Sequence, residues 1–214
     1  MQRGFGLRFR RVGWACVAVL LAVPAMAGSI ASPAGRALDF DILRKGEMIG
    51  HYHADFVDEA DHRLEVRTRI RAEVTAGPIR LYHFTHQSAE VWQGDRLVSL
   101  AADTDDDGEI HHLVVSRDGP TLLLTVDDKT HAAALDAVPS SLWNRGMLDG
   151  KRPIFDMTDG QVFRIETRCA AAEAAGSCEI SGELTRKLDY DADGMLVGLS
   201  FLADDGSKVM YRRN

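Results

Sequence analysis

Apolar and polar residues alternate along most of the chain, and the alternation is clearest between residues 63 and 75. There Leu64, Val66 and Ile70 stand at even positions, while charged side chains fill the odd positions from 63 to 73. A β-strand sends successive side chains to opposite faces, whereas a helix would spread these charges around its whole circumference. The segment therefore predicts a long strand with one buried face and one face in water.

Further segments of the same kind are separated by turn signals such as Lys45-Gly46, Asp107-Gly108 and Asp193-Gly194. Such pairs between apolar segments are typical of hairpins, and tight turns join only antiparallel neighbours. The pattern predicts a mainly β protein, a curved antiparallel meander sheet or half-barrel of about ten strands. Besides 63–75, the predicted strands are residues 40–43, 48–57, 79–92, 97–104, 110–116, 122–126, 162–169, 178–190, 195–202 and 208–212.

Residues 133–150 interrupt this rhythm. The stretch Pro139-Ser140-Ser141-Leu142-Trp143-Asn144 contains a helix start, with Ser140 or Ser141 as its cap. We expect one short helix or ordered loop here, lying across an open end of the sheet. No sharp change in composition and no repeat of fixed period indicates a second domain.

Residues 1–27 have the order of a secretory signal peptide. Four arginines and no acid lie in the first eleven residues, an uncharged apolar stretch follows, and Ala25-Met26-Ala27 ends it with a small-residue cleavage signal. We expect cleavage after Ala27, a flexible leader over residues 28–37 and a single antiparallel β domain over 38–214. An uncleaved membrane anchor is the alternative, although the apolar run is shorter than the roughly 20 residues of a spanning helix. The mature protein is accordingly expected in the periplasm or secreted, without a transmembrane span.

Charge and cysteine content narrow the picture further. The 214 residues carry 25 basic and 32 acidic side chains, a net charge of −7, and nucleic-acid binders normally show a basic surface instead. We therefore expect no nucleic-acid partner. Loss of the signal peptide removes Cys16 and leaves Cys169 and Cys178, which we expect to pair as a disulfide in an oxidising compartment. Two reduced, buried thiols are the alternative.

Two acidic turns share the pattern D-x-D-x-D-G, whose carboxylates can bind Ca²⁺. The candidate ligands are Asp103, Asp105 and Asp107 in the first turn, and Asp189, Asp191 and Asp193 in the second. Both turns lack the glutamate that a helix-loop-helix calcium site carries at loop position 12, and Asp favours turns on its own account. We expect no bound cofactor, and keep calcium at these turns as a secondary hypothesis.

His51, His53 and Asp55 alternate, so they project from one face of one predicted strand. Two imidazoles placed in this way can bind a transition metal when a third ligand comes from elsewhere. The opposite face of the same strand is apolar. The alternative is therefore a polar face in water with no metal.

The predicted strand 79–92 brings aromatic and polar side chains to one face. With Trp143 covering the same space, this face forms the candidate ligand-binding site: Tyr82, Phe84, His86, Glu90, Trp92 and Trp143. Aromatic side chains beside a few polar groups are what a small-molecule pocket requires. A sheet core whose polar groups are hydrogen-bonded internally is the alternative.

Short motifs spread over most of residues 38–212 carry a resemblance. They are Phe40-Asp41-Ile42-Leu43, Ile49-Gly50-His51, Glu90-Val91-Trp92, Thr104-Asp105-Asp106-Asp107-Gly108, Pro139-Ser140-Ser141-Leu142-Trp143-Asn144 and Tyr190-Asp191. In these motifs the chain resembles a bacterial family of exported proteins known only as a domain of unknown function. That family also looks like the half-barrel lipoprotein carriers of the periplasm, in which a curved sheet wraps round a helical plug. The resemblance implies a fold but no established activity, so no catalytic residue follows from it.

These features favour a non-catalytic exported protein that binds an apolar or amphipathic small molecule on the concave face of its sheet. The sequence has no serine-nucleophile elbow, phosphate-binding loop or zinc-protease motif. One alternative is an interaction module that docks to an envelope protein partner through an exposed strand edge. Another is an enzyme of unrecognised type that uses His86 and Glu90 as acid and base.

Overall fold

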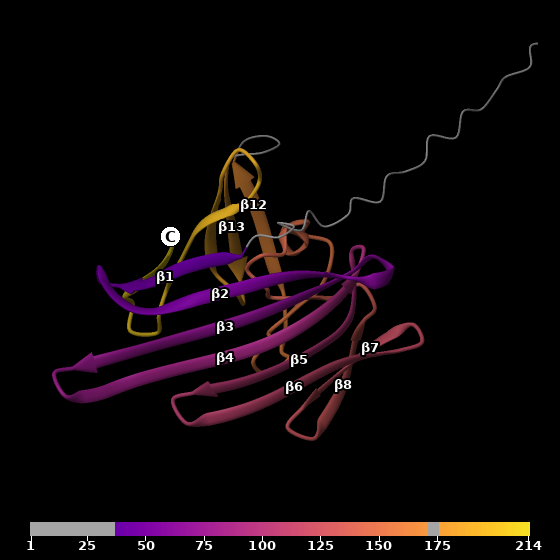
Figure 1. Ribbon diagram of the computed structural model, residues 1–214, viewed down its shortest axis with the longest axis horizontal. Helices are drawn as coiled ribbons and strands as arrows, with labels where there is room; N and C mark the ends of the chain where they lie inside the picture. Colours follow the sequence, from indigo (N-terminus) through magenta and orange to yellow (C-terminus); the bar gives the residue numbers. More distant parts are fainter. Residues whose placement is uncertain (1–36, 171–175) are drawn as a thin grey trace, which may run out of the picture.

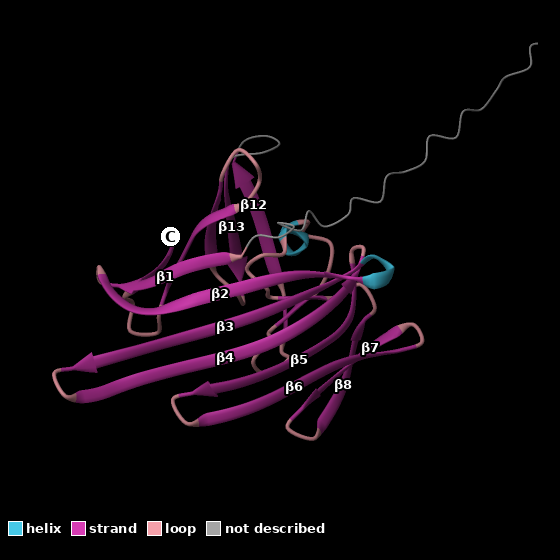
Figure 2. Cartoon of the chain, viewed as in Figure 1, coloured by secondary structure: helices cyan, strands magenta, loops and turns pink. Residues whose placement is uncertain are grey.

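The structure is a computed structural model that describes residues 37–170 and 176–214. The predicted signal peptide, its cleavage site after Ala27 and nearly all of the predicted leader lie outside the described residues. Figure 2 shows a chain made almost wholly of strands and connecting loops.

One antiparallel sheet of thirteen strands dominates the described chain, and it does not close on itself. Its order is β12-β13-β14-β15-β16-β1-β2-β3-β4-β5-β6-β7-β8. β1, the first strand along the chain, therefore pairs with β16, the last strand along the chain. The first eight are β1 (Leu38–Arg44), β2 (Glu47–Glu59), β3 (Arg63–Ala76), β4 (Ile79–Gln93), β5 (Arg96–Asp106), β6 (Glu109–Asp118), β7 (Thr121–Val126) and β8 (Lys129–Ala134). The other five are β12 (Ile165–Ala170), β13 (Gly176–Gly182), β14 (Arg186–Tyr190), β15 (Leu196–Leu202) and β16 (Lys208–Arg213).

The sheet bends into two arms. Figure 1 shows the long strands β2 to β6 sweeping across the molecule, while β12 and β13 stand at a steep angle to them. β1 joins the two arms, because it pairs with β16 on one side and β2 on the other. The predicted curved antiparallel meander is confirmed as a large open antiparallel sheet.

The alternation in the sequence decides which face of each strand is buried. In β3, Leu64, Val66 and Thr68 are buried, while Arg63 and Arg67 are exposed. Its partner β4 matches it along almost its whole length, from Arg63 opposite Gln93 onward. Because a shift of one residue would turn every apolar side chain to water, burial also sets this register.

Residues 135–164, here called the plug, cross the concave side of the sheet. They form the small three-stranded sheet β9 (Val138–Pro139), β10 (Ile154–Phe155) and β11 (Val162–Phe163), together with the short 3₁₀ helix η2 (Arg145–Leu148). Val138, Ile154 and Phe155 are fully buried in the common core. Another 3₁₀ turn, η1 (Ala60–His62), joins β2 to β3. None of the helices in the described ranges is long and apolar enough to cross a bilayer.

The predicted helix start within residues 133–150 needs a correction. The helix there is the single turn η2, and its cap is Asn144, whose side chain accepts a hydrogen bond from the Gly146 amide at 2.8 Å. Ser140 and Ser141 are not the cap. Ser141 instead uses its hydroxyl for a buried hydrogen bond to the sheet, which is a tertiary contact that no local sequence rule reveals.

The predicted number of about ten strands was too small, for two local reasons. β8 follows a turn at Asp127-Asp128, where both residues adopt positive φ without a glycine to signal it. The single strand predicted over residues 178–190 is divided into β13 and β14, because the chain turns after Gly182, whose φ is 114°. The alternation of apolar residues continues through this turn. The sequence pattern therefore does not reveal that β13 and β14 are two separate, neighbouring strands.

Gly50 in β2 supplies a first prediction, because it lies where strands approach unusually closely. A Cβ built there would clash with the backbone carbonyl oxygen of Arg71 and lie 2.7 Å from the Cα of Ala72. Gly50→Ala should therefore lower the free energy of unfolding by about 1–3 kcal/mol, as overpacking does. The matched control is Gly198→Ala, because a Cβ at Gly198 in β15 meets no atom closer than 3.6 Å. Urea denaturation of both variants checks this, and equal effects of the two would contradict it.

Candidate functional site

A cavity of about 770 Å³ opens on the concave side of the sheet. Strands β1 to β5 line one side of it, β13 to β16 line the other side, and the plug covers part of it. Most of its lining is apolar, with representative residues Ile70, Ala72, Phe84, Met157, Leu199 and Phe201. This volume is in the range of small-molecule pockets.

Three of the six predicted ligand-binding residues line this cavity. Tyr82, Phe84 and His86 project from β4 to the same face, as alternate residues of a strand must, and all three border the space. The Tyr82 hydroxyl donates a hydrogen bond to Asp106 at 2.7 Å. Burial, followed by that nearby carboxylate, raises the pKa of Tyr82, so its hydroxyl stays protonated.

His86 sits at the inner end of this row and is only 4 % exposed. Its Nδ1 lies 2.8 Å from Thr104 Oγ1, and its ring is parallel to that of Phe84 within 7°. Burial lowers the pKa of His86 to about 4. At neutral pH the His86 ring is therefore uncharged, and it lines the cavity while still offering a ring nitrogen for hydrogen bonding.

The other three predicted residues, Glu90, Trp92 and Trp143, lie in the core where the plug meets the sheet and are not among the residues that line this cavity. Glu90 and Trp92 are 0 % exposed, and Trp143 is 7 % exposed. The indole rings of Trp92 and Trp143 meet edge to face with centroids 5.6 Å apart. The surroundings of these three residues match the alternative interpretation of this face, a sheet core whose polar groups are hydrogen-bonded internally.

Glu90 is the polar centre of that core. Its carboxyl group accepts hydrogen bonds from Trp92 Nε1 at 2.9 Å, from Ser141 Oγ at 2.8 Å and from Trp143 Nε1 at 3.1 Å. Ser141 and Trp143 belong to the plug, so one side chain of β4 holds the plug against the sheet. Burial raises the pKa of Glu90 to about 7, against the opposing effect of the three donated hydrogen bonds.

His86 and Glu90, the pair considered as an acid and base, make separate contacts. His86 bonds to Thr104 on β5, whereas Glu90 bonds to Trp92 and to the plug. No hydrogen bond joins the side chains of His86 and Glu90. The geometry therefore gives no shared proton path between them.

Sequence reasoning missed the polar groups that the second arm brings to the cavity. Arg186 of β14 and Tyr211 of β16 both line it, as does Asp156 of the plug. Burial raises the pKa of Tyr211 to about 12. One signal was available: Arg186 shares the parity of the buried residues Leu188 and Tyr190, which places it on the inward face of the strand.

The two acidic turns use their carboxylates within the fold. Asp105 accepts a hydrogen bond from the Gly108 amide at 2.8 Å and lies 3.1 Å from His83 Nε2. Asp191 accepts hydrogen bonds from the backbone amides of Asp193 and Met195. Within the described ranges, no three His, Cys, Asp or Glu side chains converge to hold a metal ion.

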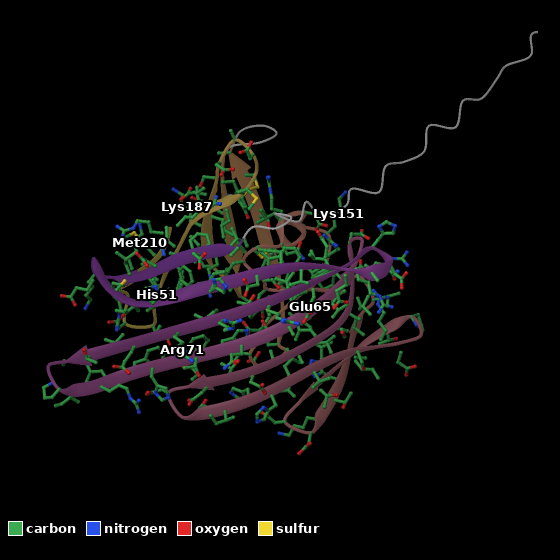
Figure 3. The ribbon with its side chains drawn as sticks, viewed as in Figure 1. His51, Glu65, Arg71, Lys151, Lys187 and Met210 are labelled. Carbon is green, nitrogen blue, oxygen red and sulfur yellow. A yellow bond between two sulfur atoms is a disulfide. The ribbon has the colours of Figure 1, made fainter. Side chains whose placement is uncertain are left out.

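His51, His53 and Asp55 do share one face of β2, and His51 lies opposite Arg71 of β3, both of which are labelled in Figure 3. His53 Nδ1 lies 2.6 Å from an oxygen of Asp39, and His53 Nε2 lies 2.9 Å from Asp55. The hydrogen bond to Asp39 is the main reason that the pKa of His53 is raised. His51 does not join this group, because it pairs with Asp41 on β1 at 3.2 Å.

The predicted disulfide is present in the structure. Cys169 of β12 and Cys178 of β13 face each other across the two strands and their sulfur atoms are bonded. The bridge ties together two strands at one edge of the sheet.

Comparison with known proteins places the chain in a family. The pattern of a family described as "Domain of unknown function (DUF6134)" matches residues 40–214. The chain belongs to this family. The resemblance noted from the sequence motifs is thereby confirmed at the level of a family of unknown function. A search of the curated proteins found no significant match.

One solved structure supports the fold of this DUF6134 chain, and a second shows a weaker similarity. A β-barrel-like protein of the domain of unknown function DUF1849 from Brucella abortus is 9 % identical and has a TM-score of 0.58, covering 83 % of this chain and 95 % of its own. A DUF1089 family protein from Pseudomonas aeruginosa is 12 % identical, with a TM-score of 0.45, covering 71 % of this chain and 89 % of its own. At such identities the first similarity speaks for the fold alone.

Glu90 generates a prediction about pH. Its pKa near 7 in the folded protein is above the roughly 4.3 of an unfolded chain, so the folded state binds the extra proton between those values. This contribution to the free energy of unfolding is complete at low pH and is lost as the pH rises through 7, by up to ~4 kcal/mol. Glu90→Gln should remove that part of the pH dependence.

The measurement is urea denaturation of wild type and variant from pH 5 to pH 8. Subtraction of the two profiles cancels the contribution of the exposed histidine–aspartate pairs, because both proteins retain them. Glu73→Gln, which changes an exposed glutamate of β3, is the matched control and should run parallel to wild type. Parallel profiles for Glu90→Gln and wild type would show that Glu90 does not titrate in this range.

Proposed function

We propose that this protein is a non-catalytic binder of an apolar or amphipathic ligand, which it holds in the cavity on the concave face of its sheet. The observation that carries the proposal is the cavity itself, with its mainly apolar lining drawn from both arms and the plug. Pockets for small molecules have this character: concave, mostly apolar, with a few polar groups that orient the ligand.

The burial pattern along β4 supports this proposal. Toward its inner end, Glu90 and Trp92 are completely covered by the plug. Toward its outer end, Tyr82 and Phe84 point to the same face but are only half-buried, although β3 pairs with β4 there as well. A large aromatic surface left half-covered on an inward face is typical of a binding site rather than a finished core.

The polar groups of the site favour binding over chemistry. At neutral pH His86 is uncharged and hydrogen-bonded to Thr104, and Tyr82 is protonated and hydrogen-bonded to Asp106. Groups in these states can orient a ligand but lack an obvious proton acceptor of matched pKa. We place the function in the cell envelope, on the strength of the predicted signal peptide and in keeping with the disulfide.

Obstruction of the cavity tests the proposal. Ala72 of β3 lines the cavity, so Ala72→Trp should fill part of it and weaken the binding of a fluorescent apolar probe, 1-N-phenylnaphthylamine, by about tenfold or more. Ala101→Trp is the matched control, because Ala101 is exposed on the opposite face of the sheet, and it should bind like wild type.

Native mass spectrometry of the protein purified from its own periplasm complements the probe. A bound molecule that disappears in Ala72→Trp and persists in Ala101→Trp is the expected result. A wild-type protein that arrives empty and takes up no probe would overturn the proposal and favour docking through an exposed strand edge instead.

A further inference from the structure

Arg186 is an inward-pointing charged group in the largely apolar lining of the cavity. It lies at the start of β14, shares its face with the buried Leu188 and Tyr190, and borders the cavity. Its guanidinium stacks over the ring of Phe201 with 4.1 Å between its central carbon and the ring centroid. Such stacking holds the planar group in place and leaves its edge free to donate hydrogen bonds.

Arg186 has almost no polar partner. The one hydrogen bond found for its side chain runs from Nη1 to the carbonyl oxygen of the preceding residue, Thr185, at 3.0 Å. Across the residues that the structure describes, no carboxylate oxygen lies within the 4.0 Å of an ion pair. A guanidinium carries five N–H donors, so most of its bonding capacity is unused.

Most other charged groups at the cavity are already engaged, and the remaining one, Asp204, is exposed in the turn that follows β15. Arg44 pairs with Asp205 at 2.6 Å, and Asp106 accepts the hydrogen bond from Tyr82. Asp156 accepts a hydrogen bond from the Thr158 amide at 2.6 Å, and burial raises its pKa. Arg186 is therefore the inward-facing charge of the cavity that has no ion pair, and the more distant carboxyl group of Asp156 only partly offsets the effect of burial on its pKa.

A partly buried cation without an ion pair is costly, because the protein replaces part of the water around it and places no opposite charge in contact with it. Burial lowers the pKa of Arg186, which expresses the same cost, but a guanidinium does not lose its proton in a protein. A bound anion would remove this cost and receive charge-assisted hydrogen bonds, which arginine commonly donates in pairs to carboxylates and phosphates.

We propose that the ligand of this cavity is an amphiphile with an anionic oxygen head group, which binds to Arg186 while its apolar chain lies against Ile70, Ala72 and Phe84. This inference rests on the proposed binding function and adds to it the chemical class of the ligand. Phe201 and Tyr211, whose ring centroids lie 6.4 Å apart, border the same end of the cavity and exclude water from the head-group contact.

The test is a set of ligands with one chain and different heads. Isothermal titration calorimetry is run with dodecanoate, dodecyl phosphate, dodecanol and dodecyltrimethylammonium, each below its critical micelle concentration. Wild type should bind the two anions about ten- to a hundredfold more tightly than dodecanol, as charge-assisted hydrogen bonds predict, and the cation most weakly. The two anions separate a carboxylate head from a phosphate head.

Variants then assign the preference to one side chain. Arg186→Met should bind dodecanol as wild type does and lose the preference for anions, while Arg186→Lys should retain part of it. Lys187→Met is the matched control, because Lys187 is the next residue of β14 and is exposed on the outer side of the arm (Figure 3). It removes the same charge from the chain and should leave the preference intact.

The outcomes separate the two proposals. Equal binding of all four amphiphiles to wild type, or tighter binding of the cation, would overturn the head-group inference and leave the binding function standing. Failure of every chain to bind would overturn both. An anion preference that survives in Arg186→Met would overturn the assignment of the head-group site to Arg186. The wild-type ligand series tests the preference for an anionic head group even where a variant does not fold.

Discussion

The hydrogen bonds of Glu90 set the architecture of the concave face. A carboxyl group buried at 0 % exposure is costly unless donors meet it, and here Trp92 from the sheet and Ser141 and Trp143 from the plug all donate to it. The plug is thereby fixed over the inner end of β4. The cavity lies beside the part of the concave surface that the plug covers, and Leu142 and Met157 of the plug border it.

β4 consequently serves two purposes with a single face. Its inner residues complete a core in which Trp143 packs edge to face against both Phe56 and Trp92. Its outer residues, Tyr82 and Phe84, stay half-buried and face the opposite arm across the cavity. The same period-two pattern runs through both halves, so the difference between core and pocket arises from what covers the strand and not from the strand itself.

Charge is distributed differently on the two sides of the sheet. On the outer side, histidines are matched with aspartates in pairs such as His53 with Asp39 and His112 with Asp103, both at 2.6 Å and exposed to water. On the inner side polar groups are few and most have partners. An unmatched Arg186 is conspicuous in that setting, because screening by water, which makes surface charges inexpensive, is reduced there.

Much of this protein follows from local chemistry. The alternation in residues 63–75 determined β3 and its buried face, and glycine-containing turns determined most hairpins. The pairing of Cys169 with Cys178 followed because they are the only cysteines left after the predicted cleavage. Strand period and turn chemistry depend on neighbours in sequence, so they can be read without the fold. Tertiary structure alone decided that β1 pairs with β16, that Ser141 bonds to Glu90, and that Arg186 shares a cavity with Tyr82. These contacts join residues more than fifty positions apart or on opposite arms, and only the curvature of the whole sheet determines which of them meet.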